Sequence, residues 1–483
     1  MIDALLLVPT LAGIAAWFLP GPGRRALLPL TGFVHLGLSL RLCFWPDPAP
    51  PGSWLALDGP GRLFLLLASL LFAVASVYAV GYLLREDPAV REDLEEGLLF
   101  RNASEAVFSS CLLFFLATMT LVAVSQHLSV LWIAIEATTL ASAPLIYFHR
   151  HHRSLEATWK YLLLCSVGIA LALLGSFFLF GAAPEGRGTL HLPRLLALAP
   201  DLQPTWLRLG FLMLVVGYGT KMGLAPMHSW LPDTHSEAPS VVSALLSGSL
   251  LNCSFLGVLR ALQVSQAAGD GAFARQVLVV LGLVSLAVAC AFMIHQPDFK
   301  RLLAYSSVEH MGILALGVGL GGVGVFGAML HALNHSLAKG GMFLLAGNFM
   351  EVYRTRSVEG VKGAMARVPW TGALWLAGAL ALAGSPPFGL FHSELAVLRA
   401  ALETPSVAAL YLTFLAIAFI GLVTPAMGMT RGPAPGGEGP LPPPPVSVGP
   451  PLVLLALVLL LGLALPEPVM ALVRDAAAAC EAR

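Results

Sequence analysis

The feature that most constrains this chain is its succession of long apolar stretches, because a helix needs about 20 mostly apolar residues to cross a bilayer. Fourteen such stretches follow one another, at residues 3–20, 26–45, 62–84, 106–125, 127–148, 160–181, 207–226, 238–262, 275–295, 302–320, 322–349, 370–391, 406–429 and 450–470. In hydrocarbon, every backbone polar group must be satisfied within the protein, which single segments achieve only as helices. The sequence therefore predicts an all-α polytopic membrane protein with about 14 transmembrane helices.

The composition agrees with this prediction. The chain is 57% hydrophobic and 11% charged, with a mean hydropathy of +0.81. Soluble proteins carry about 25% charged residues. The net charge of +0 leaves no basic excess for binding nucleic acid. We expect the lipid bilayer, and no nucleic acid, among the partners.

The distribution of lysine and arginine predicts the orientation. The loops after odd-numbered stretches carry most of these residues, including the HRHHR cluster at 149–153 and the pair Lys300 and Arg301. Loops rich in lysine and arginine face the cytoplasm. We therefore expect a multi-pass protein of the bacterial or archaeal inner (plasma) membrane, with both termini on the outer side.

Proline interrupts two of the stretches. Pro226 and Pro232 lie at and beyond the end of the seventh, and Pro386 and Pro387 lie within the twelfth. Broken helices at corresponding positions of two halves are typical of inverted-repeat transporters, with a packing kink as the alternative. We expect four parts, namely three helices over 1–105, a first five-helix repeat over 106–262, a second over 263–430, and a Pro-rich linker with the last helix over 431–483.

Ionisable residues inside the apolar stretches are the candidate functional residues. They are Glu136, Lys221, His331, His335, Lys339 and Glu394. Each costs about 2.5–3.5 kcal/mol to insert at the centre of a bilayer, which makes a functional role the default reading. The two histidines and Lys339 are spaced i, i+4, i+8 and so lie along one helix face.

Proton transfer is the chemistry that suits these groups. Burial disfavours the charged form of an ionisable side chain, and a nearby opposite charge restores it. Movement of Glu136 relative to Lys221 would then switch the lysine between holding and releasing a proton. The alternatives are a static Glu136–Lys221 ion pair, a metal or simple packing at His331 and His335, and Lys339 or Glu394 reaching the membrane interface.

Cofactor sites are not predicted. The six cysteines stand singly, with no CxxC pair and no ligand cluster of the kind that holds zinc, haem or iron–sulfur. We also find no GxGxxG of the dinucleotide-binding type. We expect this chain to bind no cofactor and no metal and to have no catalytic centre of its own.

Three segments carry a family pattern: WLPDTHSEAPS at 230–240, DFKRLLAYSSVEHMG at 298–312 and HALNHSLAKGGMFLLAG at 331–347. They resemble the antiporter-like subunits of respiratory complex I, of Mrp cation/proton antiporters and of group 4 membrane-bound hydrogenases. The resemblance covers about residues 60–425. Within that family, YLLLCSVGIALALLGSFFLF at 161–180 and LLNCSFLGVLR at 250–260 are most similar to the hydrogenase-4 component F branch.

The resemblance implies roles for particular residues. Glu136 matches the family's fifth-helix glutamate and Lys221 its seventh-helix lysine, which form a modulating pair. Lys339 and its companion histidines match the central and exit part of a proton channel, and Glu394 the terminal twelfth-helix charge. His228 and Asp233 match positions near proton uptake. The eighth stretch departs from the family, because Asn252 and Ser247 stand where many members carry a titratable residue.

The function implied by the resemblance is a proton-translocating subunit of a redox-driven complex, of the hydrogenase-4/formate hydrogenlyase or complex I-like NADH:quinone oxidoreductase kind. Its partners would be other membrane subunits and a soluble redox arm. The alternatives are a subunit of an Mrp-type cation/proton antiporter, an ion-coupled inorganic-carbon uptake subunit with a zinc-containing soluble partner, and a purely structural scaffold.

Overall fold

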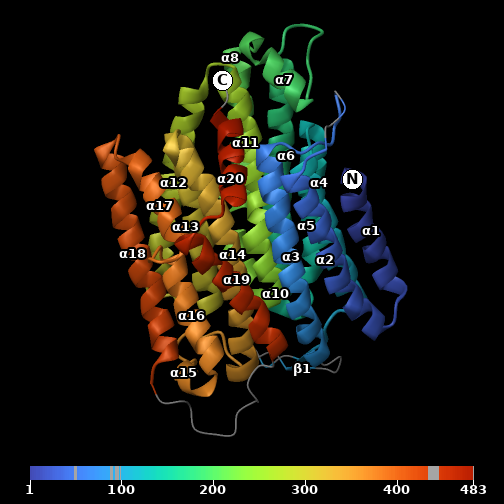
Figure 1. Cartoon of the computed structure of the whole chain (residues 1–483), viewed down its shortest axis with the longest axis vertical. Coiled ribbons are helices and arrows are strands. Elements are labelled where there is room, and N and C mark those ends of the chain that lie inside the picture. The colour runs from blue at the N-terminus through green and yellow to red at the C-terminus, as the bar shows by residue number, and fades with distance from the viewer. Residues whose placement is uncertain are drawn as a thin grey trace.

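The computed structural model is a bundle of long helices that run roughly side by side (Figure 1). It describes residues 1–47, 50, 52–86, 91–92, 97, 99–432 and 445–481. Most of the predicted Pro-rich linker, residues 433–444, lies outside the described residues. Within the described part, the one sheet is an antiparallel pair of two-residue strands, so the predicted all-α class is confirmed apart from this detail.

The first half of the chain begins with α1 (Ile2–Phe18), α2 (Gly21–Phe44) and α3 (Gly59–Arg85), followed by β1 (Arg91–Glu92) and β2 (Leu99–Phe100). It continues with α4 (Glu105–Val124), α5 (Leu128–Ile146), α6 (His152–Gly181), α7 (Leu192–Leu198), the short 3₁₀ helix η1 (Ala199–Asp201) and α8 (Pro204–Met222). Next come α9 (Trp230–Glu237), α10 (Ser240–Leu245), the π-helical turn η2 (Leu246–Leu250) and α11 (Leu251–Ala267).

The second half contains α12 (Gly271–Met293), α13 (Phe299–Leu320), α14 (Val323–Tyr353), α15 (Ala364–Arg367), α16 (Pro369–Leu382) and α17 (Gly389–Ala401). It ends with α18 (Pro405–Thr430), α19 (Pro445–Leu463) and α20 (Glu467–Glu481). In Figure 1, α19 and α20 run obliquely across the bundle, and both pack on α3 and α14. The labels N and C, which mark the two chain ends, both lie in the upper half of the view.

Ten helical segments of the described chain are long and apolar enough to cross a membrane. The other four predicted spans correspond to helices that are short, broken or charged: α1 has 17 residues, α16 and α17 are separated by a break, and α8 and α14 carry the buried lysines. A multi-pass membrane protein is therefore confirmed, whereas the count of fourteen stays a prediction.

The helix ends gather into two faces. On the first, which we call the basic face, β2 contacts the loop before α6 through the Phe100 and His151 rings. The same face includes the end of α9, since Glu237 lies 3.7 Å from the His151 ring and also pairs with Arg356 of the loop after α14 at 2.7 Å. On the opposite face, the α4–α5 loop pairs with the α6–α7 loop through an isolated bridge between His127 and His191.

Two helices are broken in the same way. In each break a glycine with positive φ, Gly223 (84°) or Gly384 (63°), is followed three residues later by a proline. Positive φ is readily adopted only by glycine. In the first break, protein groups satisfy the freed backbone: Trp230 Nε1 donates to the Thr220 carbonyl at 2.8 Å, and the Ala225 amide donates to Ser285 Oγ at 3.0 Å. Unwound backbone is tolerated at membrane depth only where protein or water lines it.

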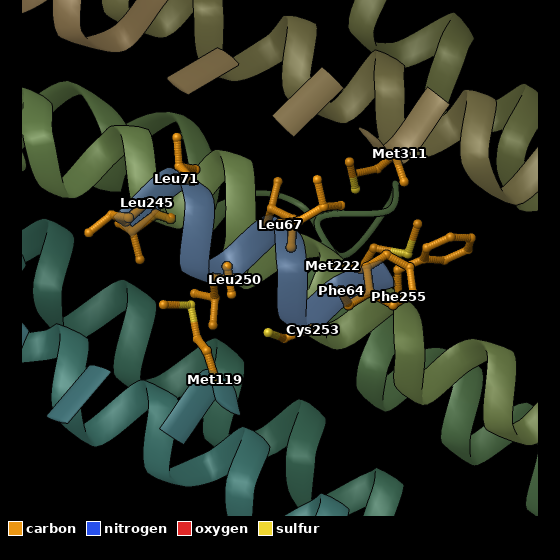
Figure 2. Packing of buried hydrophobic residues seen from close by; sticks show 14 of the residues in the cluster. Phe64, Leu67, Leu71, Met119, Met222, Leu245, Leu250, Cys253, Phe255 and Met311 are labelled. Atoms are coloured by element: carbon orange, nitrogen blue, oxygen red, sulfur yellow. The ribbon is translucent and has the colours of Figure 1, made fainter. Parts of the chain in front are cut away.

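An apolar wall closes one side of the bundle core. Figure 2 shows Phe64, Leu67 and Leu71 of α3 beside apolar side chains from α4, α8, α10 and α11. The Leu71 side chain lies so close to η2 and α14 that a Cβ at Gly248 or Gly340 would overlap it. At the level of Leu71, α3 therefore packs directly against η2 and α14.

Candidate functional site

The first polar group lies between α5 and α8. Lys221 is completely buried and donates hydrogen bonds to the Ile135 carbonyl and to Thr139 Oγ1. Thr139 Oγ1 lies 3.3 Å from Glu136 Oε2, and Ser166 Oγ donates to Glu136 Oε1 at 2.9 Å. Glu136 itself is only half-buried. The carboxylate and the ammonium are thus joined through the Thr139 hydroxyl, and no direct ion pair between them is present among the described residues.

The second polar group bridges the two halves of the bundle. In η2, Ser247 Oγ lies 2.8 Å from Ser307 Oγ of α13. One turn later, Asn252 Nδ2 donates to Ser336 Oγ of α14 at 2.6 Å. Single π-helical turns inside α-helices are frequent at functional sites. Hydroxyls and an amide therefore occupy the position between Lys221 and Lys339 at which a titratable residue was expected.

The third polar group surrounds Lys339 at the centre of α14. Its ammonium is completely buried and donates to the Leu303 carbonyl of α13 at 2.7 Å. Glu309, also on α13 and 3% exposed, is the carboxylate whose charge acts on it. Lys339 therefore does not reach the membrane interface, which removes that alternative for this residue.

A cluster of three histidines continues from this lysine. His310 of α13 lies between His331 and His335, with ring centroids 5.0 and 4.9 Å away. His310 Nδ1 lies 2.9 Å from His331 Nε2, and His331 Nδ1 lies 2.9 Å from Ser393 Oγ of α17. Glu394, 7% exposed, follows Ser393 and does not reach an interface within this chain. The cluster thus leads from the middle of α14 to the second broken helix.

Two of these histidines, together with Glu394, also have the chemistry of metal ligands. His310, His331 and Glu394 each place one ligand atom within 4.8 Å of the others. The sequence alone offered His331 and His335 as a pair; the group in the structure keeps His331, leaves out His335 and adds His310 and Glu394. However, the hydrogen bonds to His310 and Ser393 occupy both nitrogens of His331, which is the arrangement of a relay and which a metal would have to displace.

Buried polar atoms without a protein partner follow the same line. In the part of the chain that the structure describes, they include Ser249 Oγ, Asn252 Oδ1, His310 Nε2, Asn334 Oδ1 and both ring nitrogens of His235 and His335. Leaving such an atom unsatisfied costs about 1–3 kcal/mol. Buried water is the usual partner of polar atoms that the protein leaves unsatisfied. The line is therefore suited to a chain of water molecules.

The residues predicted to lie near proton uptake are at the basic face, around α9. Asp233 pairs with Lys160 at 2.9 Å and with Arg301 at 2.8 Å, so two cations neutralise it. His228 is half-buried in the first break, with its ring centroid 6.3 Å from that of Tyr305. Deeper in the same region, His235 is completely buried and stacks on Phe343.

Several site residues were missed by sequence reasoning. Thr139 was hidden because a threonine in an apolar helix usually bonds its own backbone. Glu309 and His310 stood inside the DFKRLLAYSSVEHMG segment, where their charge at mid-span was the available signal. Lys300 was interpreted as a loop cation; the structure corrects this, because its side chain is 1% exposed at the second residue of α13.

Comparison with known proteins adds to this geometry. A family model described as NADH:quinone oxidoreductase/Mrp antiporter, transmembrane, matches residues 125–421. The chain is 35% identical over 413 residues to a hydrogenase-4 component F homologue of Methylacidiphilum infernorum, covering 83% of this chain and 85% of that protein. It is 31% identical over 362 residues to NADH-quinone oxidoreductase subunit N of Desulforudis audaxviator, covering 74% and 68%.

The fold is similar to a solved chain as well. In the structure of respiratory complex I from Thermus thermophilus with bound NADH, one chain superposes with a TM-score of 0.83 at 25% identity. The match covers 100% of this chain and 99% of that one. The similarity therefore extends to the helices on both sides of residues 125–421.

Proposed function

Since the chain belongs to the NADH:quinone oxidoreductase/Mrp antiporter transmembrane family, in which it is an antiporter-like membrane subunit, we propose that it translocates protons within a redox-driven complex. The complex would be of the hydrogenase-4/formate hydrogenlyase or complex I-like kind. The observation that carries this proposal is the line of polar side chains that runs from the half-buried Glu136 through the buried Lys221, Asn252 and Lys339 to Glu394.

The path is proposed to work in two linked parts. Around Lys221, a change in partner subunits would move Glu136 and so change the stability of the ammonium charge. Around Lys339, a proton taken up from the basic face would pass through the histidine cluster and leave near Glu394. Against a membrane potential of 150 mV, each proton costs about 3.5 kcal/mol. One or two hydrogen bonds to a buried charge, at about 1.5–3 kcal/mol each, are of the same size.

The finer architecture is part of the proposal. We infer fourteen spans, with inverted five-helix repeats over 106–262 and 263–430, and the matched Gly-x-x-Pro breaks at Gly223 and Gly384 support this pairing. The arginine-bearing loops gathered on the basic face support a cytoplasmic location for that face, which would leave both termini on the outer side.

The relatives are subunits of larger assemblies, so other membrane subunits are the partners to expect. A soluble redox arm bound to those subunits is proposed, and no cofactor is assigned to this chain. Electron transfer would then occur in the partners, and this chain would respond only through changes in conformation and charge.

A second candidate is a subunit of an Mrp-type cation/proton antiporter. The family model that matches the chain includes Mrp antiporters, which is the observation that favours it. This alternative needs no redox partner, and it predicts that proton flux depends on sodium.

Co-purification in a mild detergent separates the two candidates. Under the proposed function, a tagged chain brings down a nickel–iron hydrogenase subunit or a subunit with a quinone site. In proteoliposomes, potential-driven proton flux then stays the same when choline replaces sodium. Recovery of antiporter subunits alone, together with sodium-dependent flux, would overturn the proposal in favour of the Mrp reading.

A further inference from the structure

Lys300 is a buried cation that the line described above does not use. It is the second residue of α13, and its side chain is 1% exposed. Its Nζ donates to the carbonyls of Ser236 at 3.0 Å and of Ala238 at 2.6 Å, at the carboxyl end of α9. Carbonyls at the end of a helix have no partner within that helix and attract positive charge.

The hydrogen bonds of Lys300 are compatible with both protonation states. A protonated lysine has three N–H donors. The two carbonyls use two of them, and no protein acceptor is recorded for the third within the described residues. A neutral amine still has two N–H donors for the same carbonyls, and its lone pair replaces the third proton. One proton can therefore leave and return without breaking either contact.

The surroundings give this proton a direction. Toward the basic face, Lys300 interacts with the charges of Arg356, Asp298 and Glu237. On the inner side, His235 interacts with the charges of both Lys300 and Lys339. The imidazole of His235 is completely buried, and neither ring nitrogen has a hydrogen-bond partner in the described structure. It thus lies within the electrostatic reach of both lysines with its proton-binding atoms free.

We propose that Lys300 is the proton-uptake residue of the path, passing its third proton to His235, directly or through water, and from there toward Lys339. The transfer leaves a neutral amine on Lys300 and an imidazolium on His235; once His235 has passed its proton on, a proton from the basic face restores the ammonium. This assignment rests on the proposed proton-translocating function. It also gives Asp233, which two cations neutralise, an anchoring role for α9 in place of proton uptake.

The competing explanation is that Lys300 has a purely structural role and holds the carboxyl end of α9 in place by its charge alone. Arginine separates the two, because it donates to the same carbonyls but does not release its proton in proteins. A histidine in place of Lys300 would do the reverse: it can release a proton near neutral pH, but it cannot donate to both carbonyls.

The test uses the intact complex in proteoliposomes, with proton flux driven by a potassium–valinomycin potential and normalised to assembled complex. A relay predicts that Lys300→Arg and Lys300→Gln each lower the flux at least tenfold, with Lys300→His in between. Flux near the wild-type level in Lys300→Arg would overturn the proposal. The matched control is Lys362→Gln, an exposed lysine of the α14–α15 loop, which should retain full flux.

A variant of His235, the next residue of the proposed relay, covers the case in which the Lys300 variants do not assemble. His235→Gln leaves the lysine and its two carbonyls untouched, and it should also lower the flux at least tenfold; normal flux there would overturn the relay. Lys221→Met and Lys339→Met are measured in the same series. If they lose flux while Lys300→Arg and His235→Gln keep it, only this inference fails, whereas full flux in all four removes the proposed function itself.

Discussion

Thr139 is the side chain whose loss tests the coupling of Glu136 to Lys221 most sharply. Its hydroxyl accepts a hydrogen bond from the Lys221 ammonium and lies 3.3 Å from Glu136 Oε2. Thr139→Val keeps the branched shape but removes both contacts, leaving the ammonium with the Ile135 carbonyl alone.

The expected size of the effect follows from these contacts. A hydrogen bond to a charged group contributes about 1.5–3 kcal/mol. If about 2 kcal/mol of this is lost from the step in which Lys221 exchanges its proton, the rate falls about thirtyfold, because each 1.36 kcal/mol is a factor of ten. Potential-driven proton flux in proteoliposomes of the intact complex measures this directly.

Thr158 of α6 provides the matched control. It is also buried, and its hydroxyl donates to the Ser154 carbonyl of its own helix at 2.7 Å, with no bond to Glu136 or Lys221. Thr158→Val should keep its flux within about twofold of wild type, because the proton path does not use this hydroxyl. In a Glu136→Gln background, Thr139→Val should cost clearly less than it does alone. Equal losses at both threonines, or additive losses with Glu136→Gln, would refute the reasoning.

Two further predictions concern the bridge between the two halves of the bundle and the ion pair of Arg260 in α11 with Asp58 at the start of α3. Asn252→Leu removes the donor to Ser336 Oγ and should lower proton flux at least tenfold without loss of assembly; unchanged flux would exclude this bridge from the path. Arg260→Met leaves the Asp58 carboxylate without its ion pair and should destabilise the fold by about 3 kcal/mol, measured by thermal unfolding in detergent. Burial raises the pKa of Asp58, but Arg260 and the Gly61 amide lower it more, so the net pKa is below its usual value. The stabilisation is therefore complete above about pH 4 and is lost as the pH falls through the lowered pKa. The difference between wild type and Arg260→Met should narrow in acid, and a constant difference down to pH 3 would contradict this.

The helices and the buried charges could be predicted from sequence because both depend on the contrast between apolar and ionisable side chains. A long apolar stretch predicts a span, and an ionisable residue inside it stands out against its neighbours. The sequence separates the predicted stretches 106–125 and 127–148 at residue 126, and in the structure α4 ends at Val124 and α5 begins at Leu128. The positions of Lys221, Lys339 and Glu394 as buried groups are likewise as expected.

The remaining part of the site depends on contacts between helices, which periodicity does not encode. Thr139 acquires its role only because α8 delivers Lys221 to it, and Ser336 only because η2 brings Asn252 close. Lys300 was misplaced for a related reason. A lysine at the start of a span is expected to be interfacial, but here the carboxyl end of α9 provides two carbonyls that bind its ammonium inside the protein.

The central claim is that the buried lysines carry protons through the membrane. The most direct measurement is proton flux into vesicles that contain the intact, assembled complex with Lys221→Met or Lys339→Met. The account predicts that each substitution lowers the flux at least tenfold, while the exposed Lys362→Gln variant keeps it. Wild-type flux in both buried-lysine variants, at equal levels of assembled complex, would contradict the account.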